Sequence, residues 1–153
     1  MKFWNDLADN QVLISAIIGW TVAQLLKTII DFSLNKSFSA ERLVGSGGMP
    51  SSHSATVCAL TTAAALVYGV SSFEFAICFI LSAVVMYDAM GVRQQAGKQA
   101  KLLNWILDQD FFTDNNEAFQ KRLKELIGHT PLQVLAGAIL GIILAIVIDG
   151  YYV

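Results

Sequence analysis

The chain has 153 residues, of which 55% are hydrophobic and only 14% are charged. A soluble domain carries about 25% charged residues, so this composition predicts an integral membrane protein with a single domain over residues 1–153. The formal net charge of −2 excludes a basic nucleic-acid-binding surface. With two cysteines and two histidines in all, the spacing of a zinc site is absent, and neither metal nor cofactor is expected.

Four apolar segments are each long enough to cross the ~30 Å hydrocarbon layer of a membrane, which takes about 17–25 helical residues. These predicted spans cover residues 11–33, 54–70, 73–92 and 131–149. A short turn makes the second and third spans an antiparallel hairpin, whereas polar residues 93–130 separate the third from the fourth. Apolar spacing within that polar section predicts two amphipathic helices, the second over residues 114–128. The expected fold class is therefore all-α: an integral membrane bundle of about four transmembrane helices plus two amphipathic helices.

Basic residues are distributed unevenly between the two sides of these spans. Lys36 and Arg42 lie in the first loop and six further basic residues lie in 93–130, whereas the opposite side carries only Lys2. Cytoplasmic loops of membrane proteins carry an excess of lysine and arginine. We therefore expect both basic loops in the cytoplasm and both termini outside, as in a protein of the bacterial inner membrane.

Five ionisable groups fall on the same side of this predicted topology. His53 opens the second span, and His129 immediately precedes the fourth. Lys27 and Asp88 lie near the inner ends of the first and third spans, and Arg93 lies just beyond the third. Ionisable groups at membrane depth are costly, so each one is a functional hypothesis. Their convergence on the cytoplasmic face indicates a site.

Both histidines stand at helix starts, where backbone N–H groups and the helix dipole favour an anion. The glycine-rich run before His53, which includes Gly48, brings bare backbone close to a ligand. Lys27 and Arg93 would bind phosphate oxygens and stabilise charge during phosphoryl transfer. One histidine to attack phosphorus and one to protonate the leaving oxygen make a phosphomonoesterase that needs no metal.

Helix capping is the simpler explanation for several of the polar residues. Ser51 and Ser52 have the side chains of an N-cap. Thr130 and Gln133 fit a capping box before the fourth span, which would explain them without catalysis. Residues 137–141 form a GxxxG pattern, which is typical of helix packing. The position of both histidines at helix starts on one side nevertheless favours a site.

Three stretches of the chain carry a resemblance to a known superfamily. They read GGMPSSHSA at 47–55, YDAMGVRQQAGKQAKLLN at 87–104 and GHTPLQVLAGAILG at 128–141. In order and spacing they resemble the divergent, short membrane branch of the type-2 phosphatidic-acid phosphatase superfamily. That superfamily includes lipid phosphatases and the vanadium haloperoxidases.

The resemblance implies a role for each residue that matches a superfamily motif. PSSH corresponds to the motif PSGH, so His53 would be the acid that protonates the leaving group. Ser51, with the backbone at Ser52, would contact phosphate. His129 would be the nucleophile that forms a phosphohistidine intermediate, and Lys27 would stand in for the lysine of the first motif.

The chain also departs from the superfamily pattern. The aspartate four residues after the nucleophile, which orients its imidazole, is Gln133 here. The arginine six residues before the nucleophile is also missing. Arg93 and Lys98 are the candidates to supply the missing phosphate-binding charge, and Asp88 is the candidate carboxylate.

These observations favour a membrane phosphatase acting at the cytoplasmic leaflet on a lipid phosphomonoester of the phosphatidic acid or phosphatidylglycerophosphate class. Its expected partners are the bilayer and this lipid, with no nucleic acid, and so thin a bundle leaves room for a homo-oligomer. The alternative, favoured by Gln133, is a non-catalytic membrane protein that binds anionic lipid headgroups, or a scaffold or transporter subunit. A phosphatase of soluble substrates is a third possibility, and a reversed topology would direct the site to periplasmic lipid phosphates.

Overall fold

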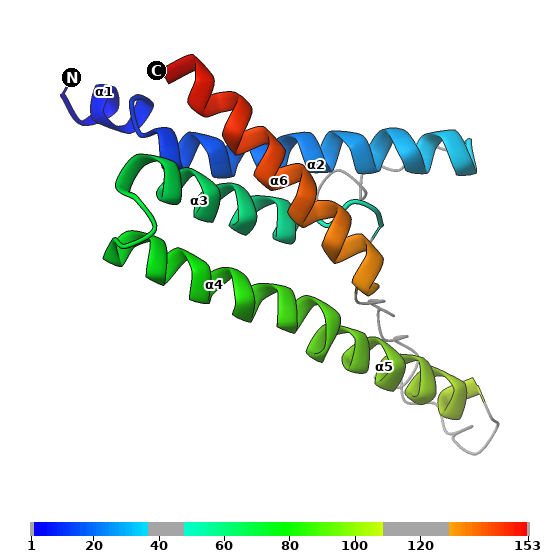
Figure 1. Cartoon of the computed structure of the whole chain (residues 1–153). Coiled ribbons are helices and arrows are strands. Elements are labelled where there is room, and N and C mark those ends of the chain that lie inside the picture. The colour runs from blue at the N-terminus through cyan, green and yellow to red at the C-terminus, as the bar shows by residue number, and fades with distance from the viewer. Residues whose placement is uncertain (1, 37–47, 109–128, 153) are drawn as a thin grey trace.

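The computed structural model describes residues 2–36, 48–108 and 129–152, and within these ranges the chain forms helices and no strand. Figure 1 shows the helices, which are α1 (Lys2–Ala8), α2 (Gln11–Asn35), α3 (Ser52–Tyr68), α4 (Phe73–Met90), α5 (Val92–Asp108) and α6 (Pro131–Tyr152). The all-α fold predicted from the sequence is confirmed.

Short polar side chains and glycines determine where the long helices begin and end. Asn10 caps α2, because its side chain accepts a hydrogen bond from the N–H of Leu13 at 3.0 Å. At the tight turn between α3 and α4, Gly69 adopts a positive φ of 83° and Ser72 caps α4. This turn confirms the predicted antiparallel hairpin.

Helix α3 lies at the centre of the bundle and packs against α2, α4 and α6 (Figure 1). The Ser51 N–H donates to the Gln133 carbonyl at 3.0 Å, so α3 and α6 start side by side and run parallel. At the other end the Gln11 side-chain amide donates to the Asp149 carboxylate at 2.6 Å, joining the start of α2 to the end of α6. Helices α2 and α6 also pack against each other, whereas the backbones of α2 and α4 stay more than 8 Å apart.

Glycines allow α2 and α6 to approach the backbone of α3 closely. A Cβ atom at Gly19 would lie 3.0 Å from both the Ala55 carbonyl oxygen and the Ala59 Cβ. A Cβ at Gly137 or Gly141 would overlap the carbonyl oxygens of α3 itself. The GxxxG pattern therefore packs helices, as the sequence predicts, because only a residue without a side chain fits between the two backbones.

A pair of hydroxyl groups connects α4 to α3. The Thr61 and Ser82 hydroxyl oxygens lie 2.6 Å apart, and both side chains are buried. Ser82 also donates to the Val57 carbonyl at 2.9 Å. Hydrogen bonds between helices stabilise bundles inside a membrane, where water cannot replace them.

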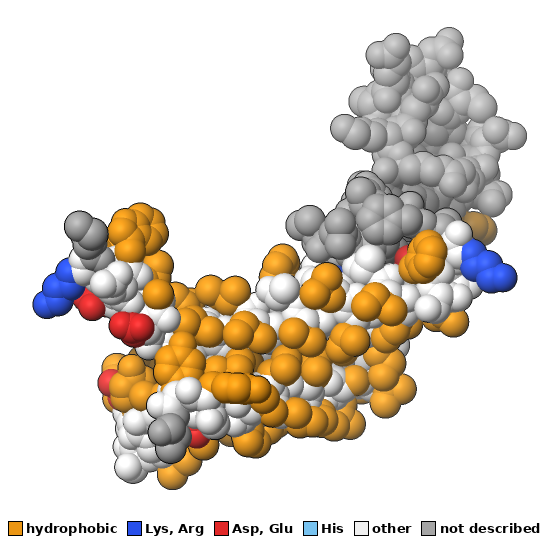
Figure 2. Space-filling model, turned by 90° about the horizontal axis from the view of Figure 1, so that it is seen from above, with side chains coloured by type: hydrophobic (Ala, Val, Ile, Leu, Met, Phe, Trp, Pro, Cys, Tyr) orange, Lys and Arg blue, Asp and Glu red, His pale blue; other side chains and the backbone are white. Residues whose placement is uncertain are grey.

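Three stretches of the described chain are long and apolar enough to cross a membrane: Gln11–Leu34, Phe73–Ile106 and Pro131–Tyr152. Figure 2 shows one face of the molecule, where hydrophobic side chains cover most of the described part and charged side chains lie near its ends. Helix α3 has 17 residues, at the lower end of the length that spans a bilayer, and most of its side chains are buried by its neighbours. The four predicted spans thus correspond to three apolar helices around a short central one.

The remaining predictions concern the segments outside this core. Helix α5 confirms the first amphipathic helix, while the second, predicted over 114–128, lies outside the described residues. Helix α1 was not predicted from the sequence, and it exposes the aromatic side chains of Phe3 and Trp4.

Candidate active site

The two histidines of the chain lie together at one end of the bundle. His53 is the second residue of α3, and His129 lies two residues before the start of α6. Their ring centroids are 6.0 Å apart and the ring planes meet at 62°, an edge-to-face arrangement. Because α3 and α6 are parallel, the positive ends of both helix dipoles meet at this histidine pair.

Backbone hydrogen bonds from three helices hold the histidine pair in place. The Ser51 N–H donates to the Gln133 carbonyl at 3.0 Å, which ties the start of α3 to the first turn of α6. The His129 N–H donates to the Ala89 carbonyl at 3.1 Å, which ties the segment before α6 to the end of α4. His129 is also buried, and together with these backbone hydrogen bonds this burial fixes its position.

Ser51 both caps α3 and helps to position its first turn. Its hydroxyl oxygen accepts hydrogen bonds from the Ser54 N–H at 3.4 Å and from the Ser54 hydroxyl at 3.1 Å. The first N–H groups of a helix point outward along its axis. Those of Ser52 and His53 therefore face the end of the bundle where the imidazoles lie, so capping by Ser51 leaves the helix start able to bind an anion.

Lys27 is buried beside the loop that leads into α3. Only 3% of its surface is exposed, and the neighbouring Gln24 is also buried. A Cβ at Gly48 would lie 3.0 Å from Lys27 Cγ and 3.1 Å from Cδ, and Gly48 has a φ of +86°. Glycine therefore meets two requirements at this position, the left-handed backbone and the space for the lysine side chain.

Gln133 sets the tautomer of His129. Its Oε1 atom lies 3.1 Å from the Thr130 N–H and 3.2 Å from His129 Nδ1. A backbone N–H can only donate, so the amide oxygen faces it, and this oxygen can only accept a hydrogen bond from Nδ1. Nδ1 therefore carries a proton, so Nε2 is the nitrogen whose lone pair becomes available to a nucleophile when the imidazole is neutral.

The other predicted site residues lie at the junction of α4 and α5. Asp88 is half-buried in the last turn of α4, next to the Ala89 carbonyl that accepts from His129. Arg93 belongs to the first turn of α5, but its side chain lies outside the described part of the structure. Lys98 is exposed on α5, which packs only against α4 among the described helices. The structure thus does not place Lys98 in the buried group.

Comparison with known proteins agrees with the resemblance seen in the sequence. Residues 8–144 match the model of the Divergent PAP2 family. The chain belongs to the Divergent PAP2 family. It is also similar to the uncharacterized membrane protein YuiD of Bacillus subtilis (strain 168), with 37% identity over 156 residues that cover 96% of this chain and 99% of that protein. No solved structure matches it.

Two features of this Divergent PAP2 family site were missed by sequence reasoning. The Ala89 carbonyl positions His129, and no side-chain pattern reports a backbone acceptor. Gly137 packs against the Ser51 backbone, so the GxxxG pattern supports the site as well as the bundle. The glycine spacing was the available signal, but the sequence did not show which helix it faces.

Proposed function

We propose that this Divergent PAP2 family protein is a metal-independent phosphatase that hydrolyses a lipid phosphomonoester of the phosphatidic acid or phosphatidylglycerophosphate class. The observation that carries the proposal is the histidine pair, with ring centroids 6.0 Å apart where the starts of α3 and α6 meet. Two rings this close can contact one phosphoryl group at once, so one imidazole can approach its phosphorus atom to ~3–3.5 Å while the other contacts an oxygen bonded to it.

In the first step, Nε2 of His129 attacks the phosphorus atom and the bond from phosphorus to the lipid oxygen breaks. Protonated His53 gives its proton to this oxygen, so the lipid leaves as a neutral alcohol. The phosphoryl group stays on His129 as a phosphohistidine. The hydrogen bond from Nδ1 to Gln133 supports this direction of attack, because it leaves the lone pair on Nε2.

In the second step, water attacks the phosphorus atom of the phosphohistidine. His53, now neutral, takes a proton from this water, and the bond between phosphorus and Nε2 breaks. Inorganic phosphate leaves, and both histidines return to their starting protonation states. The same residue thus acts first as acid and then as base.

The buried ammonium group of Lys27 and the N–H groups of Ser52 and His53 would bind the phosphate oxygens. The proposal also keeps Arg93 and Lys98 as further phosphate ligands. Asp88 is kept as the carboxylate at the α4–α5 junction. The site would face the inner leaflet of the membrane, in agreement with the uneven distribution of basic residues.

Phosphate release from phosphatidic acid by the purified protein tests this function. We expect His129→Ala to abolish both turnover and the radiolabelled phosphoenzyme that acid quenching traps. We expect His53→Ala to slow turnover about a hundredfold or more, because general acid catalysis contributes that much. Tyr151→Ala, which changes an exposed residue at the far end of α6, should leave turnover unchanged.

A substrate with a better leaving group separates the two histidines. A nitrophenyl phosphate ester needs no proton on its leaving oxygen, so His53→Ala should still release about one equivalent of nitrophenol in a burst and accumulate the phosphoenzyme, because the second step still lacks its base. His129→Ala should release no nitrophenol. Absence of turnover by the wild-type protein across a panel of lipid phosphates would contradict the proposal and favour a protein that binds anionic headgroups without hydrolysis.

A further inference from the structure

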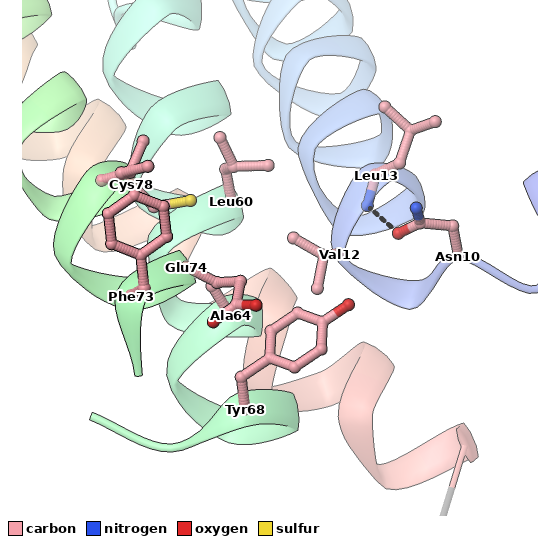
Figure 3. Close-up of a pocket in the computed structure, with 10 residues that line it drawn as sticks. Asn10, Val12, Leu13, Leu60, Ala64, Tyr68, Phe73, Glu74 and Cys78 are labelled. Atoms are coloured by element: carbon pink, nitrogen blue, oxygen red, sulfur yellow. Dashed lines mark hydrogen bonds between the residues drawn. The ribbon is translucent and has the colours of Figure 1, made fainter. Parts of the chain in front are cut away.

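A cavity of about 500 Å³ lies between α2, α3 and α4, toward the end of the bundle away from the histidine pair (Figure 3). Its lining is mostly apolar near the middle of the bundle, at Leu60, Ala64, Ile77 and Cys78, whereas Asn10, Tyr68 and Glu74 line its far end. Neither the histidine pair nor Lys27 lines it. The proposed phosphatase chemistry therefore leaves this cavity without a role.

One face of α3 connects the histidine pair to the cavity. Between Ser52 and Thr61 all side chains are buried except those of His53, Thr56 and Leu60, which are half-buried. Their spacing of three and four residues puts them on one face of the helix, and Ala64 continues that face four residues later. Within residues 52–61, the least covered strip of α3 thus begins at a proposed catalytic histidine and reaches the cavity at Leu60.

This strip of α3, from His53 to Leu60, lies between α2 and α4, and its surface is termed the groove. Helices α2 and α4 both pack on α3, but their backbones stay more than 8 Å apart. Both helices belong to stretches long and apolar enough to cross a membrane, so the groove opens sideways into the bilayer. The near end of the cavity, at Leu60 and Ala64, lies seven and eleven residues beyond His53, which is about 10–17 Å along a helix. Half of a ~30 Å hydrocarbon layer has a similar depth.

We propose that one hydrocarbon chain of the lipid phosphate lies along this strip of α3, between α2 and α4, with its end in the cavity. This inference rests on the proposed function of the histidine pair, because the phosphate at that pair fixes where the chain begins. The groove would then align the lipid so that its phosphate meets both imidazoles. It also assigns the substrate class: a lipid whose chain reaches the depth of Leu60 and beyond.

Photo-crosslinking locates the chain without requiring turnover. The probe is phosphatidic acid with a diazirine at the end of one acyl chain, mixed with the full-length protein in vesicles. We expect crosslinks at Leu60–Ala64 and Ile77–Cys78 that excess unlabelled phosphatidic acid removes. Crosslinks at Phe79, which is exposed to bulk lipid, should persist under the same competition. Cavity crosslinks that are absent, or that resist competition as those at Phe79 do, overturn the proposal.

A tryptophan introduced into the cavity should weaken the binding of long-chain substrates only. Ile77 lines the cavity and is 52% exposed, and Phe79 on the same helix, α4, is 54% exposed. Because they are two residues apart, their side chains lie on opposite sides of the helix, so Phe79 is the matched control. We expect Ile77→Trp to raise KM for dipalmitoyl phosphatidic acid about fivefold or more, as overfilling of a packed site does. KM for dihexanoyl phosphatidic acid, whose chains end before the cavity, should stay unchanged. Phe79→Trp should change neither value.

The outcomes of these two experiments separate this inference from the proposed function. If the two tryptophan variants change KM equally while the wild-type protein turns over substrate, the proposed acyl-chain groove is wrong and the proposed phosphatase activity is supported. Competed crosslinks in the cavity without turnover of either lipid support the groove and count against the phosphatase. Absence of both turnover and competed crosslinks overturns both.

Discussion

The acceptor beside His129 is an amide in this chain, where the wider superfamily has a carboxylate. Gln133 Oε1 lies 3.2 Å from Nδ1 and is oriented by the Thr130 N–H, so it holds the same tautomer that an aspartate would hold. An amide adds no negative charge, however, so it does not stabilise the protonated form of the imidazole as a carboxylate does. The replacement therefore preserves the geometry of the proposed nucleophile and changes only its electrostatics.

Two substitutions at Gln133 separate geometry from charge. Gln133→Leu removes the acceptor for His129, and we expect kcat to fall about tenfold or more because the imidazole loses its fixed tautomer. Gln133→Glu keeps an acceptor and adds charge, so kcat at alkaline pH should be retained. A carboxylate favours protonated His129, which cannot attack, so the acidic limb of the pH–rate profile should move to higher pH. An unchanged profile in Gln133→Glu would contradict the assignment.

Gly48 offers a second test at the scale of single residues. Gly48 and Gly69 have similar positive φ angles of 86° and 83°, but only a Cβ at Gly48 would meet Lys27. Gly48→Ala and Gly69→Ala should each cost roughly 1–3 kcal/mol of stability, because a positive φ is unfavourable for a residue with a Cβ. Only Gly48→Ala should also raise KM for the lipid phosphate, because it displaces the lysine stem. Equal KM values in the two variants would show that Lys27 does not bind substrate.

At the scale of helices, the contact between α6 and α3 determines the geometry of the site. A Cβ at Gly137 would lie within 3.1 Å of the backbone nitrogen and carbon of Ser51, and closer still to its carbonyl oxygen. The same residue, Ser51, donates its N–H to Gln133. The separation of the two helices and the distance between the histidines therefore depend on the absence of a side chain at position 137.

Gly137→Ala should damage both stability and activity. Backbone atoms cannot move aside as a flexible side chain can, so α3 and α6 must separate at a cost of about 1–3 kcal/mol. Turnover should fall by up to about a hundredfold, because a displacement of ~1 Å at the histidines has that effect. Gly150→Ala is the matched control in the same helix, since a Cβ there meets nothing within 4 Å. It should raise the melting temperature slightly, because alanine favours the helix, and a similar loss in both variants would contradict this account.

At the scale of the whole molecule, the sequence was sufficient for the helices and insufficient for their packing. Hydropathy and caps predicted the bounds of α2, α4 and α6 to within three residues at each end. They did not show that α3 is the central helix, because its serines, threonines and alanines were interpreted as part of a membrane span like the other three and not as a packing surface. The distribution of basic residues placed both histidines on the same side of the membrane. Their ring separation of 6.0 Å, however, depends on glycine contacts and on the Ala89 carbonyl, which no local sequence pattern encodes.

Figure 1 also places the two termini together at the end of the bundle opposite the starts of α3 and α6. The termini and the histidine pair therefore face opposite sides of the membrane, whichever side is the cytoplasm. Lys36 and the basic residues of α5 lie toward the histidine end, and this asymmetry predicts that the histidine end is cytoplasmic. We expect a secreted alkaline phosphatase fused after residue 153 to be active in a bacterial host, and a fluorescent protein fused there to be dark.

Thiol labelling provides the matching measurement for the histidine end. In a Cys58→Ala, Cys78→Ala background, Lys98→Cys should react with a membrane-impermeant maleimide only after the cells are opened, because Lys98 is exposed on the predicted cytoplasmic side. Lys2→Cys should react in intact cells. The reverse pattern in both assays would show that the protein has the opposite orientation in the membrane. The site would then face lipid phosphates of the outer leaflet. The internal geometry of the histidine pair would be unaffected, since the contacts that build it do not depend on orientation.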